Sequence, residues 1–198
     1  MTLQRVPGQT YRVEGEVQED PFTQEDYVRL RSALENHRDI LLVKSLRATG
    51  LRIAEMLSVT PEQIEGNGPE TYILVRRGKK RLKTGAVAKW EKIHLPRELG
   101  LELRHYMQGN GMVIGVPIWG VKARQVRNIL AKAGLKAIGR RIHPHEFRHL
   151  YIKTLIDAGL PAEAAAKMVG HASSQTTEKY YYRLTADQQR EIQQRIEV

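Results

Sequence analysis

The chain has 198 residues, enough for one domain with a substantial hydrophobic core. Its composition, 41% hydrophobic and 27% charged, is typical of a globular protein. No apolar run approaches the roughly 20 residues that span a bilayer, so we expect no membrane partner. There is no secretory signal and no cysteine, which favours a cytoplasmic location. The net charge of +10 favours a nucleic-acid partner, although a basic solvated surface would give the same charge.

The residue pattern of the N-terminal part predicts a tail followed by helices. Residues 1–20 are polar and rich in turn-forming residues, which indicates a tail or linker remnant ahead of one domain over 21–198. Thr23 followed by Asp26 predicts a capping box at the start of a first helix.

Two further helical segments precede residue 60. The apolar run Ile40–Leu46 leads to Gly50, which we expect to end that helix. A new helix is predicted from Arg52, with Met56 among the residues that face inward.

The only convincing strand patterns lie in the middle of the chain. Residues 71–75 and 92–95 are rich in Thr, Tyr, Ile and Val, which predicts an antiparallel β-hairpin with a long cationic connection. Trp90 and Trp119 are interpreted as core or hairpin-packing residues.

The rest of the chain reads as helices separated by glycines, Gly134 among them. The predicted helices are Glu98–Met107, Lys122–Ala133, His145–Ala158, Ala162–Val169, Thr176–Leu184 and Ala186–Ile196. The fold class is therefore predicted to be mainly α with a small antiparallel β-hairpin, that is, α+β.

One short motif suggests phosphate chemistry. If Pro144 opens a helix, His145 and Arg148 lie three positions apart on neighbouring parts of one face. A guanidinium offers a fork of donors to phosphate oxygens, and an imidazole can donate a hydrogen bond or move a proton near neutral pH. Alone, this spacing is weak evidence, because solvated helices often contain it.

The surrounding sequence resembles the tyrosine recombinase, or phage integrase, family. Pro144–His149 reads Pro-His-Glu-Phe-Arg-His, Val169–His171 reads Val-Gly-His, and Thr176–Tyr180 reads Thr-Thr-Glu-Lys-Tyr, all in the family's order. Upstream, Thr49–Leu57 is similar to the family's Thr-Gly-x-Arg turn, with an acidic residue three positions after the arginine. The resemblance covers 21–198 and implies the family's catalytic-domain fold. We expect the helical DNA-clamp (core-binding) domain that usually precedes it to be absent.

The resemblance implies roles for five residues. Arg52 and Arg148 would hold the non-bridging oxygens of the scissile phosphate, and Tyr180 would attack the phosphorus. His145 would transfer a proton with the tyrosine hydroxyl, and His171 would donate a hydrogen bond to the phosphate. Of three consecutive tyrosines, the spacing from His171 favours Tyr180. No cofactor, metal or ATP is then required.

Two further side chains would support these residues. They are the carboxylate of Glu55, one helical turn after Arg52, and the imidazole of His149. For Glu55, an ordinary helix-surface role is the alternative. In the family a hairpin lysine protonates the leaving 5′ oxygen. Lys79 is the predicted general acid here, with Lys83 and Lys80 as alternatives.

Double-stranded DNA is the expected partner. The predicted DNA-binding residues are Arg76, Arg77, Arg81, Lys122, Arg124, Arg127, Arg140 and Arg141; attraction to the phosphate backbone, or a plain solvated surface, would also explain them. In the family the C-terminal segment, here 184–198, docks on a neighbouring protomer. We therefore expect dimers or tetramers on DNA, and an accessory DNA-binding protein could supply the missing clamp.

These observations predict a site-specific recombinase that cleaves and rejoins DNA through a 3′-phosphotyrosine, acting in integration, excision, transposition or dimer resolution. Two alternatives remain open. One is DNA relaxation by a type IB topoisomerase-like enzyme, and the other is a catalytically inert DNA-binding module.

Overall fold

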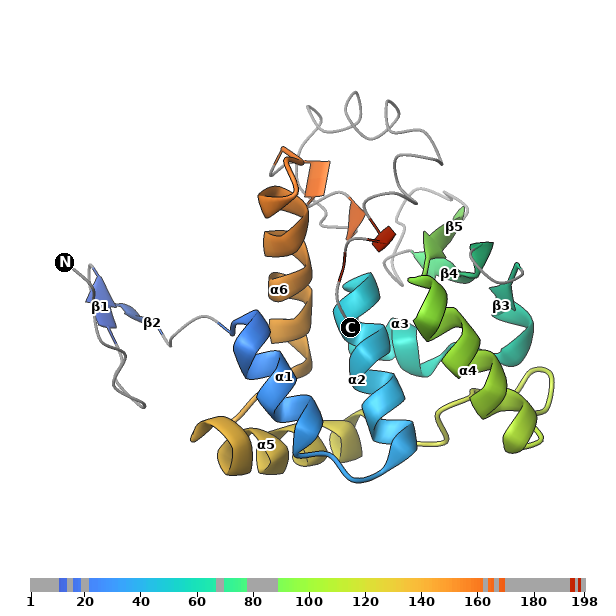
Figure 1. Ribbon diagram of the computed structural model, residues 1–198, viewed down its shortest axis with the longest axis horizontal. Coiled ribbons are helices and arrows are strands. Elements are labelled where there is room, and N and C mark those ends of the chain that lie inside the picture. The colour runs from blue at the N-terminus through green and yellow to red at the C-terminus, as the bar shows by residue number, and fades with distance from the viewer. Residues whose placement is uncertain are drawn as a thin grey trace, which may run out of the picture.

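The chain is a helical body with a small sheet at one side (Figure 1). The computed structural model describes residues 11–13, 16–18, 22–66, 70–77, 89–161, 164–165, 168–169, 193–194 and 196. The described helices are α1 (Gln24–Ser32), α2 (His37–Thr49), α3 (Ile53–Leu57), α4 (Arg97–Gly109), α5 (Ala123–Ile138) and α6 (Pro144–Asp157). One 3₁₀ turn, η1 (Pro61–Gln63), follows α3. The predicted α+β class is confirmed.

Local signals explain where the first helices begin. The Thr23 hydroxyl accepts a hydrogen bond from the Asp26 amide at 3.2 Å, and the Asp26 carboxylate accepts one from the Thr23 amide at 3.1 Å. This is the predicted capping box, which satisfies two amides that the helix cannot pair. The Asn36 side chain caps α2 by accepting from the Arg38 amide at 2.9 Å.

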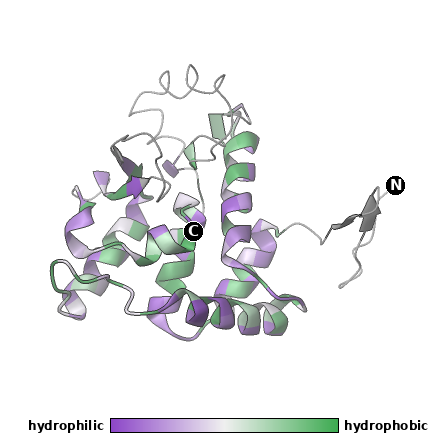
Figure 2. Ribbon diagram, turned by 180° about the vertical axis from the view of Figure 1, so that it is seen from behind, coloured by the Kyte–Doolittle hydropathy of each residue, from purple (hydrophilic) through white to green (hydrophobic). Residues whose placement is uncertain are grey.

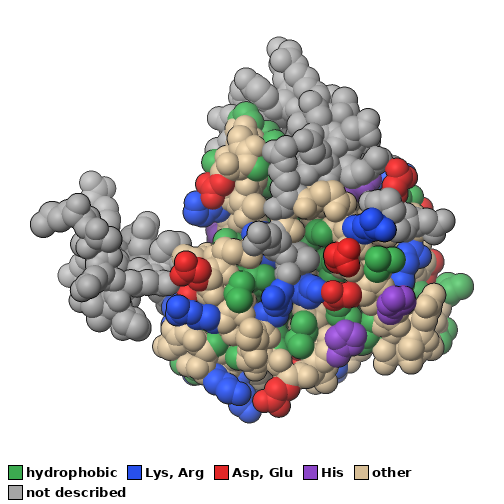
Figure 3. Space-filling view, in the orientation of Figure 1, with side chains coloured by type: hydrophobic (Ala, Val, Ile, Leu, Met, Phe, Trp, Pro, Cys, Tyr) green, Lys and Arg blue, Asp and Glu red, His purple; other side chains and the backbone are tan. Residues whose placement is uncertain are grey.

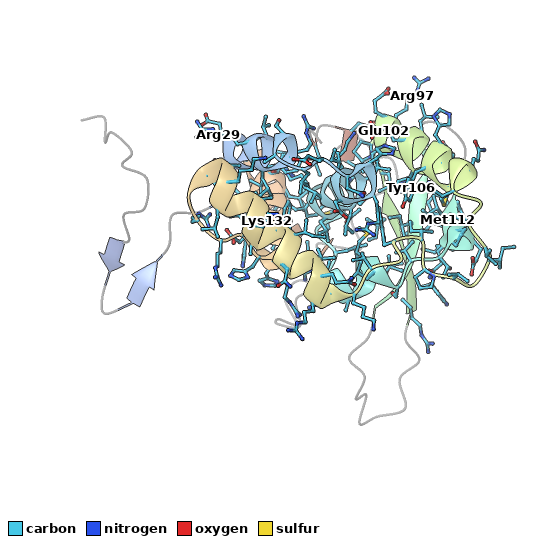
Figure 4. All side chains as sticks on the ribbon, turned by 90° about the horizontal axis from the view of Figure 1, so that it is seen from below. Arg29, Arg97, Glu102, Tyr106, Met112 and Lys132 are labelled. Atoms are coloured by element: carbon cyan, nitrogen blue, oxygen red, sulfur yellow. The ribbon has the colours of Figure 1, made fainter. Side chains whose placement is uncertain are left out.

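Helix α2 lies at the centre of the core. Leu41, Leu42 and Leu46 are at most 1% exposed, because α2 contacts α3, α4 and α6. Glu102 of α4 is directed towards α2, where its carboxylate accepts from the Lys44 ammonium at 2.6 Å (Figure 4). Helix α5 packs against α1, and hydrophilic and hydrophobic residues alternate along α5 and α6 (Figure 2). The core therefore holds α3 and α6, the two helices that carry the predicted site, in fixed positions.

The sheet confirms the predicted hairpin and adds a strand. β4 (Tyr72–Arg77) and β5 (Lys89–His94) pair antiparallel, and β3 (Ile64–Glu65) pairs with the free edge of β4. The sequence did not predict β3, because two residues are too few to show an alternating pattern. The cationic connection over 78–88 lies outside the described residues.

Gly134 does not end a helix as predicted. It lies inside α5, which continues to Ile138 and ends at Gly139 in the left-handed conformation, with φ of 78°. A Cβ on Gly134 would come within 2.6 Å of the Arg140 carbonyl oxygen. The glycine is therefore required by close packing of the returning chain, not by the helix terminus.

The two tryptophans have opposite environments. Trp119 is 1% exposed, and its indole donates to the Met56 carbonyl at 2.9 Å, as expected for a core residue. Trp90 is 57% exposed, so a core role for it is wrong; it lies on β5 of the hairpin, opposite Arg76.

Both ends of the chain contribute short elements. Residues 11–18, within the predicted tail, include the paired strands β1 (Tyr11–Val13) and β2 (Glu16–Gln18), drawn apart from the helices in Figure 1. Near the C-terminus, Gln193 and Ile196 are 2% and 3% exposed. The Tyr151 hydroxyl donates to the Gln193 side-chain oxygen at 3.0 Å, so these two residues dock on their own chain here.

The helices predicted over 162–169, 176–184 and 186–196 fall mostly outside the described residues. None of the helices that the structure describes combines the length and the apolarity needed to cross a membrane.

Candidate active site

The turn between α2 and α3 brings the predicted arginines together. Gly50 ends α2 with φ of 60°, and a Cβ there would come within 2.5 Å of the Tyr151 ring. Glycine is therefore required at this position both by the backbone conformation and by the space. Arg52 follows two residues later, and Arg148 of α6 donates to the Gly50 carbonyl at 2.8 Å. One turn thus links the two arginines, although they are 96 positions apart in the sequence.

Glu55 fixes both the start of α3 and the direction of Arg52. One carboxylate oxygen accepts from the Arg52 amide at 2.8 Å, and the other accepts from the Arg52 guanidinium at 3.0 Å. The Arg52 side chain remains 44% exposed, whereas that of Glu55 is 16% exposed. Glu55 therefore holds one side of the guanidinium, and the solvent-facing side is accessible to an anion. This arrangement agrees with the predicted role of Glu55 as an orienting acid.

Arg148 is buried and tied to the backbone. It is 1% exposed, and its guanidinium donates to the Gly50 carbonyl and to the Val169 carbonyl. It therefore joins the end of α2, the first turns of α6 and the chain at Val169, which directly precedes Gly170 and His171 of the predicted motif. Desolvation strengthens the field of this charge at the site.

The start of α6 places two histidines near Arg148. The Glu146 carboxylate accepts from the His143 amide at 2.9 Å and caps the helix, which begins at Pro144. His145 is exposed, and its ring meets that of His149 edge to face, with centroids 4.7 Å apart. His149 therefore contacts His145 directly, and the support of the site by His149 stays a prediction.

A cavity of about 360 Å³ lies between α3 and the start of α6. Its lining residues are Leu51, Arg52, Ile53, Ala54, Arg127, His143, Pro144 and His145. Four of these can carry positive charge and none is acidic, so the cavity favours an anion. Arg127 was predicted to bind DNA. His143 is not among the residues predicted for the site; its position next to Pro144 and His145 is the sequence signal that it lies close to the site.

The environment of the site lowers the pKa of His145 below its ordinary value of 6.5. Partial desolvation of the ring is the main cause, followed by the positive charges of His149, Arg148 and Arg52. The ring is therefore neutral at pH 7 and able to accept a proton. A base with a lowered pKa works at neutral pH and is lost as the pH falls through that pKa.

This arrangement predicts the effect of His149→Gln. Removing the charge of His149 raises the pKa of His145. In a plot of cleavage rate against pH, the acid limb therefore moves to higher pH. An NMR titration of the His145 ring in the free protein measures the same shift. His37→Gln, at a ring that contacts Tyr106 instead, should change neither measurement. An acid limb that stays in place or moves to lower pH would contradict the assignment.

The predicted DNA-binding residues have unequal surroundings. Arg76, Lys122, Arg124, Arg127 and Arg141 are exposed. Arg140 is only 20% exposed and pairs with Glu146 at 2.7 Å, so its charge supports the start of α6. On the face shown in Figure 3, the described Lys and Arg side chains are interspersed with Asp and Glu.

Several predicted residues are not among those described. Six of them lie outside the described residues: Tyr180, His171, Lys79, Lys80, Lys83 and Arg81. The side chain of Arg77 is also outside the described part. Within the described part of the chain, no three His, Cys, Asp or Glu side chains gather in a way that could hold a metal ion.

Known proteins resemble both the sequence and the fold. The chain is 29% identical over 145 residues to the tyrosine recombinase XerC of Corynebacterium glutamicum, covering 72% of this chain and 46% of that protein. It matches the XerH site-specific recombinase bound to difH substrate with a TM-score of 0.61, at 18% identity over 83% of this chain and 50% of that one. A lambda integrase dimer bound to a COC′ core site gives a TM-score of 0.59, at 17% identity over 82% of this chain and 61% of that one.

The chain spans about half of the length of the curated relatives it matches. The model of the phage integrase family matches residues 21–188, a span that contains all of the sequence motifs. The chain therefore belongs to the phage integrase family.

Proposed function

We propose that this chain is the catalytic region of a site-specific DNA recombinase, which cleaves and rejoins strands through a 3′-phosphotyrosine intermediate. The observation that carries the proposal is the joining of Arg52 and Arg148 through Gly50, beside a cavity whose lining includes Arg52, Arg127 and two histidines but no acid. Family membership supports the reaction type.

In this proposal the scissile phosphate occupies the anion-favouring cavity. Arg52, oriented by Glu55, binds a non-bridging oxygen with a charge-assisted hydrogen bond. Arg148 contributes its buried charge and holds the backbone on which the site is built. The extra negative charge of the five-coordinate phosphorus is stabilised more strongly than that of the ground state, and this difference accelerates the reaction.

Tyr180 is the proposed nucleophile. Its oxygen forms a bond to phosphorus while the bond from phosphorus to the 5′ oxygen breaks, and His145 accepts the tyrosine proton. Lys79, or Lys83 or Lys80 in its place, protonates the leaving oxygen, and His171 donates to the phosphate. Attack by a 5′ hydroxyl of another strand restores the phosphodiester and the free tyrosine. The exchange conserves one phosphoester bond, so it needs no ATP, and the arginines supply the positive charge that a metal would otherwise provide.

The partners follow from the same proposal. Double-stranded DNA is the substrate, bound by the exposed cations of α5 and the hairpin, and at least two protomers must meet to exchange strands. The DNA-bound XerH recombinase and the lambda integrase dimer on a core site support this inference. An accessory DNA-binding protein is a further proposed partner. We also propose that the reaction takes place in the cytoplasm.

A suicide substrate tests the proposal. A duplex nicked close to the cleavage point loses a short fragment on attack, so rejoining fails and the covalent complex accumulates. We expect a protein–DNA adduct in excess EDTA, resistant to boiling in detergent and sensitive to protease. A requirement for divalent metal, or binding without any adduct on substrates carrying the target site, would contradict the proposal.

The same substrates separate the two alternatives. A type IB topoisomerase-like enzyme relaxes supercoiled DNA without a specific site, whereas a recombinase forms adducts only at its target sequence. An inert module binds DNA and forms no adduct. The motif Val169-Gly170-His171 with Thr176, Thr177 and Tyr180 favours the recombinase.

A further inference from the structure

The outer face of the β4–β5 hairpin carries an exposed tryptophan. The register places Arg76 opposite Trp90, Leu74 opposite Lys92, and Tyr72 opposite His94. Because side chains alternate along a strand, these six share one face, and the neighbouring residues Ile73, Val75 and Ile93 point into the core, where they are at most 9% exposed.

The base of this outer face is covered, and the end near the connection is open. The Tyr72 and His94 rings meet edge to face at 5.8 Å, and the Lys92 ammonium lies 4.5 Å from the centroid of the Tyr72 ring. Trp90, one pair from the open end of the hairpin, is 57% exposed, and its cross-strand neighbour Arg76 is also exposed. The hairpin therefore presents an indole and a guanidinium side by side to solvent.

The sequence that leads to Trp90 is cationic. The connection over 78–88 contains four Lys or Arg residues and no acid, and Lys89 directly precedes Trp90. An exposed surface that binds another protein is usually a continuous apolar patch, whereas Trp90 is exposed beside the guanidinium of Arg76 on a face that also carries Lys92. Such a combination suits single-stranded nucleic acid, since bases stack on aromatic rings while cations bind the phosphates between them.

The hairpin is also next to the candidate active site. Strand β4 contacts α3, the helix that begins directly after Arg52. If one duplex contacts both the hairpin and α3, a base at Trp90 belongs to the DNA held next to the cleavage site. Strands that are to be exchanged must unpair from one partner and pair with another, so unstacked bases must exist near the cut.

We propose that Trp90 is a stacking residue for the substrate: its indole face packs on an unpaired nucleobase near the cleavage point, and Arg76 binds the adjoining phosphate. This inference rests on the proposed function. It makes Trp90 a positioning residue that stabilises locally opened DNA, without a part in the proton transfers.

Fluorescence and binding measurements on matched DNA test the proposal. The chain has two tryptophans, and Trp119 is buried, so a change in emission on adding DNA reports Trp90. Two duplexes of one sequence are compared, one fully paired and one with two unpaired bases at the cleavage point. We expect stronger quenching with the unpaired duplex, and no such quenching in Trp90→Phe.

Affinities give the second readout. Trp90→Ala should weaken binding of the unpaired duplex by about tenfold, Trp90→Phe by less, and binding of the paired duplex should change little. Ile114→Ala, which shortens a 77% exposed apolar side chain on the loop after α4, is the matched control and should leave both affinities unchanged.

The outcomes separate this inference from the proposed function. If Trp90→Ala weakens both duplexes equally, or neither, while the suicide substrate still gives an adduct, stacking by Trp90 is wrong and the recombinase assignment stands. If the wild-type chain neither binds DNA nor forms the adduct, both are wrong. Unchanged thermal unfolding of the variants shows that the losses arise at the surface.

Discussion

Arg148→Ala is expected to abolish strand cleavage and to lower stability substantially. The change removes the donors to the Gly50 and Val169 carbonyls and leaves two acceptors in a buried environment. Each unsatisfied group costs about 1–3 kcal/mol. Thermal unfolding should therefore occur several degrees lower, and no adduct should form on the suicide substrate even at temperatures where the variant is folded.

Arg47→Ala is the matched control for Arg148. Arg47 is also buried, at 2% exposure, and donates to the Gln24 side chain at 3.0 Å and to the Thr154 hydroxyl at 2.9 Å. Its loss should lower stability to a similar extent but leave the cleavage rate of the folded protein near that of the wild type. Equal loss of cleavage in both variants would mean that Arg148 acts through folding alone.

Arg52→Ala should lower the cleavage rate strongly and leave the stability of the fold nearly unchanged. Its exposed guanidinium contributes little to folding, because exposed ion pairs such as that with Glu55 are worth about 0–1 kcal/mol. The backbone bond from the Arg52 amide to Glu55 remains possible in the variant. Removal of one group that stabilises the transition state lowers the rate by about 10²–10³-fold. Single-turnover cleavage at saturating DNA measures this effect.

Arg29→Ala controls for the loss of one positive charge. Arg29 is exposed on α1 and is labelled in Figure 4 at the end of the molecule away from the hairpin. This variant should keep the single-turnover rate and at most weaken DNA binding slightly. A rate for Arg52→Ala within tenfold of that for Arg29→Ala would contradict a role for Arg52 at the phosphate.

The sequence predicted the parts of the fold that depend on local chemistry. The Thr23–Asp26 capping box, the left-handed Gly50 and the hairpin each follow from residues close together in the chain, and all are present. The pairing of Arg52 with Glu55 could also be predicted, because the two residues lie one helical turn apart.

Features that depend on distant contacts could not be predicted. Gly134 looked like a helix end because its close neighbour, the Arg140 carbonyl, comes from a returning segment. Trp90 looked like a core residue because hydrophobicity alone gives no information on which side of the hairpin stays open. His143 reaches the cavity because the start of α6 lies across it from α3, although the two are far apart in the sequence. The donors of the buried Arg148 depend on the carbonyls of Gly50 and Val169.

The nucleophile is the central claim, and peptide mapping of the covalent adduct tests it most directly. The adduct trapped on the suicide substrate is digested with protease and nuclease, and the phosphonucleotide-bearing tyrosine is identified by tandem mass spectrometry. We predict the modification on Tyr180, no adduct from Tyr180→Phe, and normal adducts from Tyr181→Phe and Tyr182→Phe. An adduct on another residue, or one that survives Tyr180→Phe, would contradict the account.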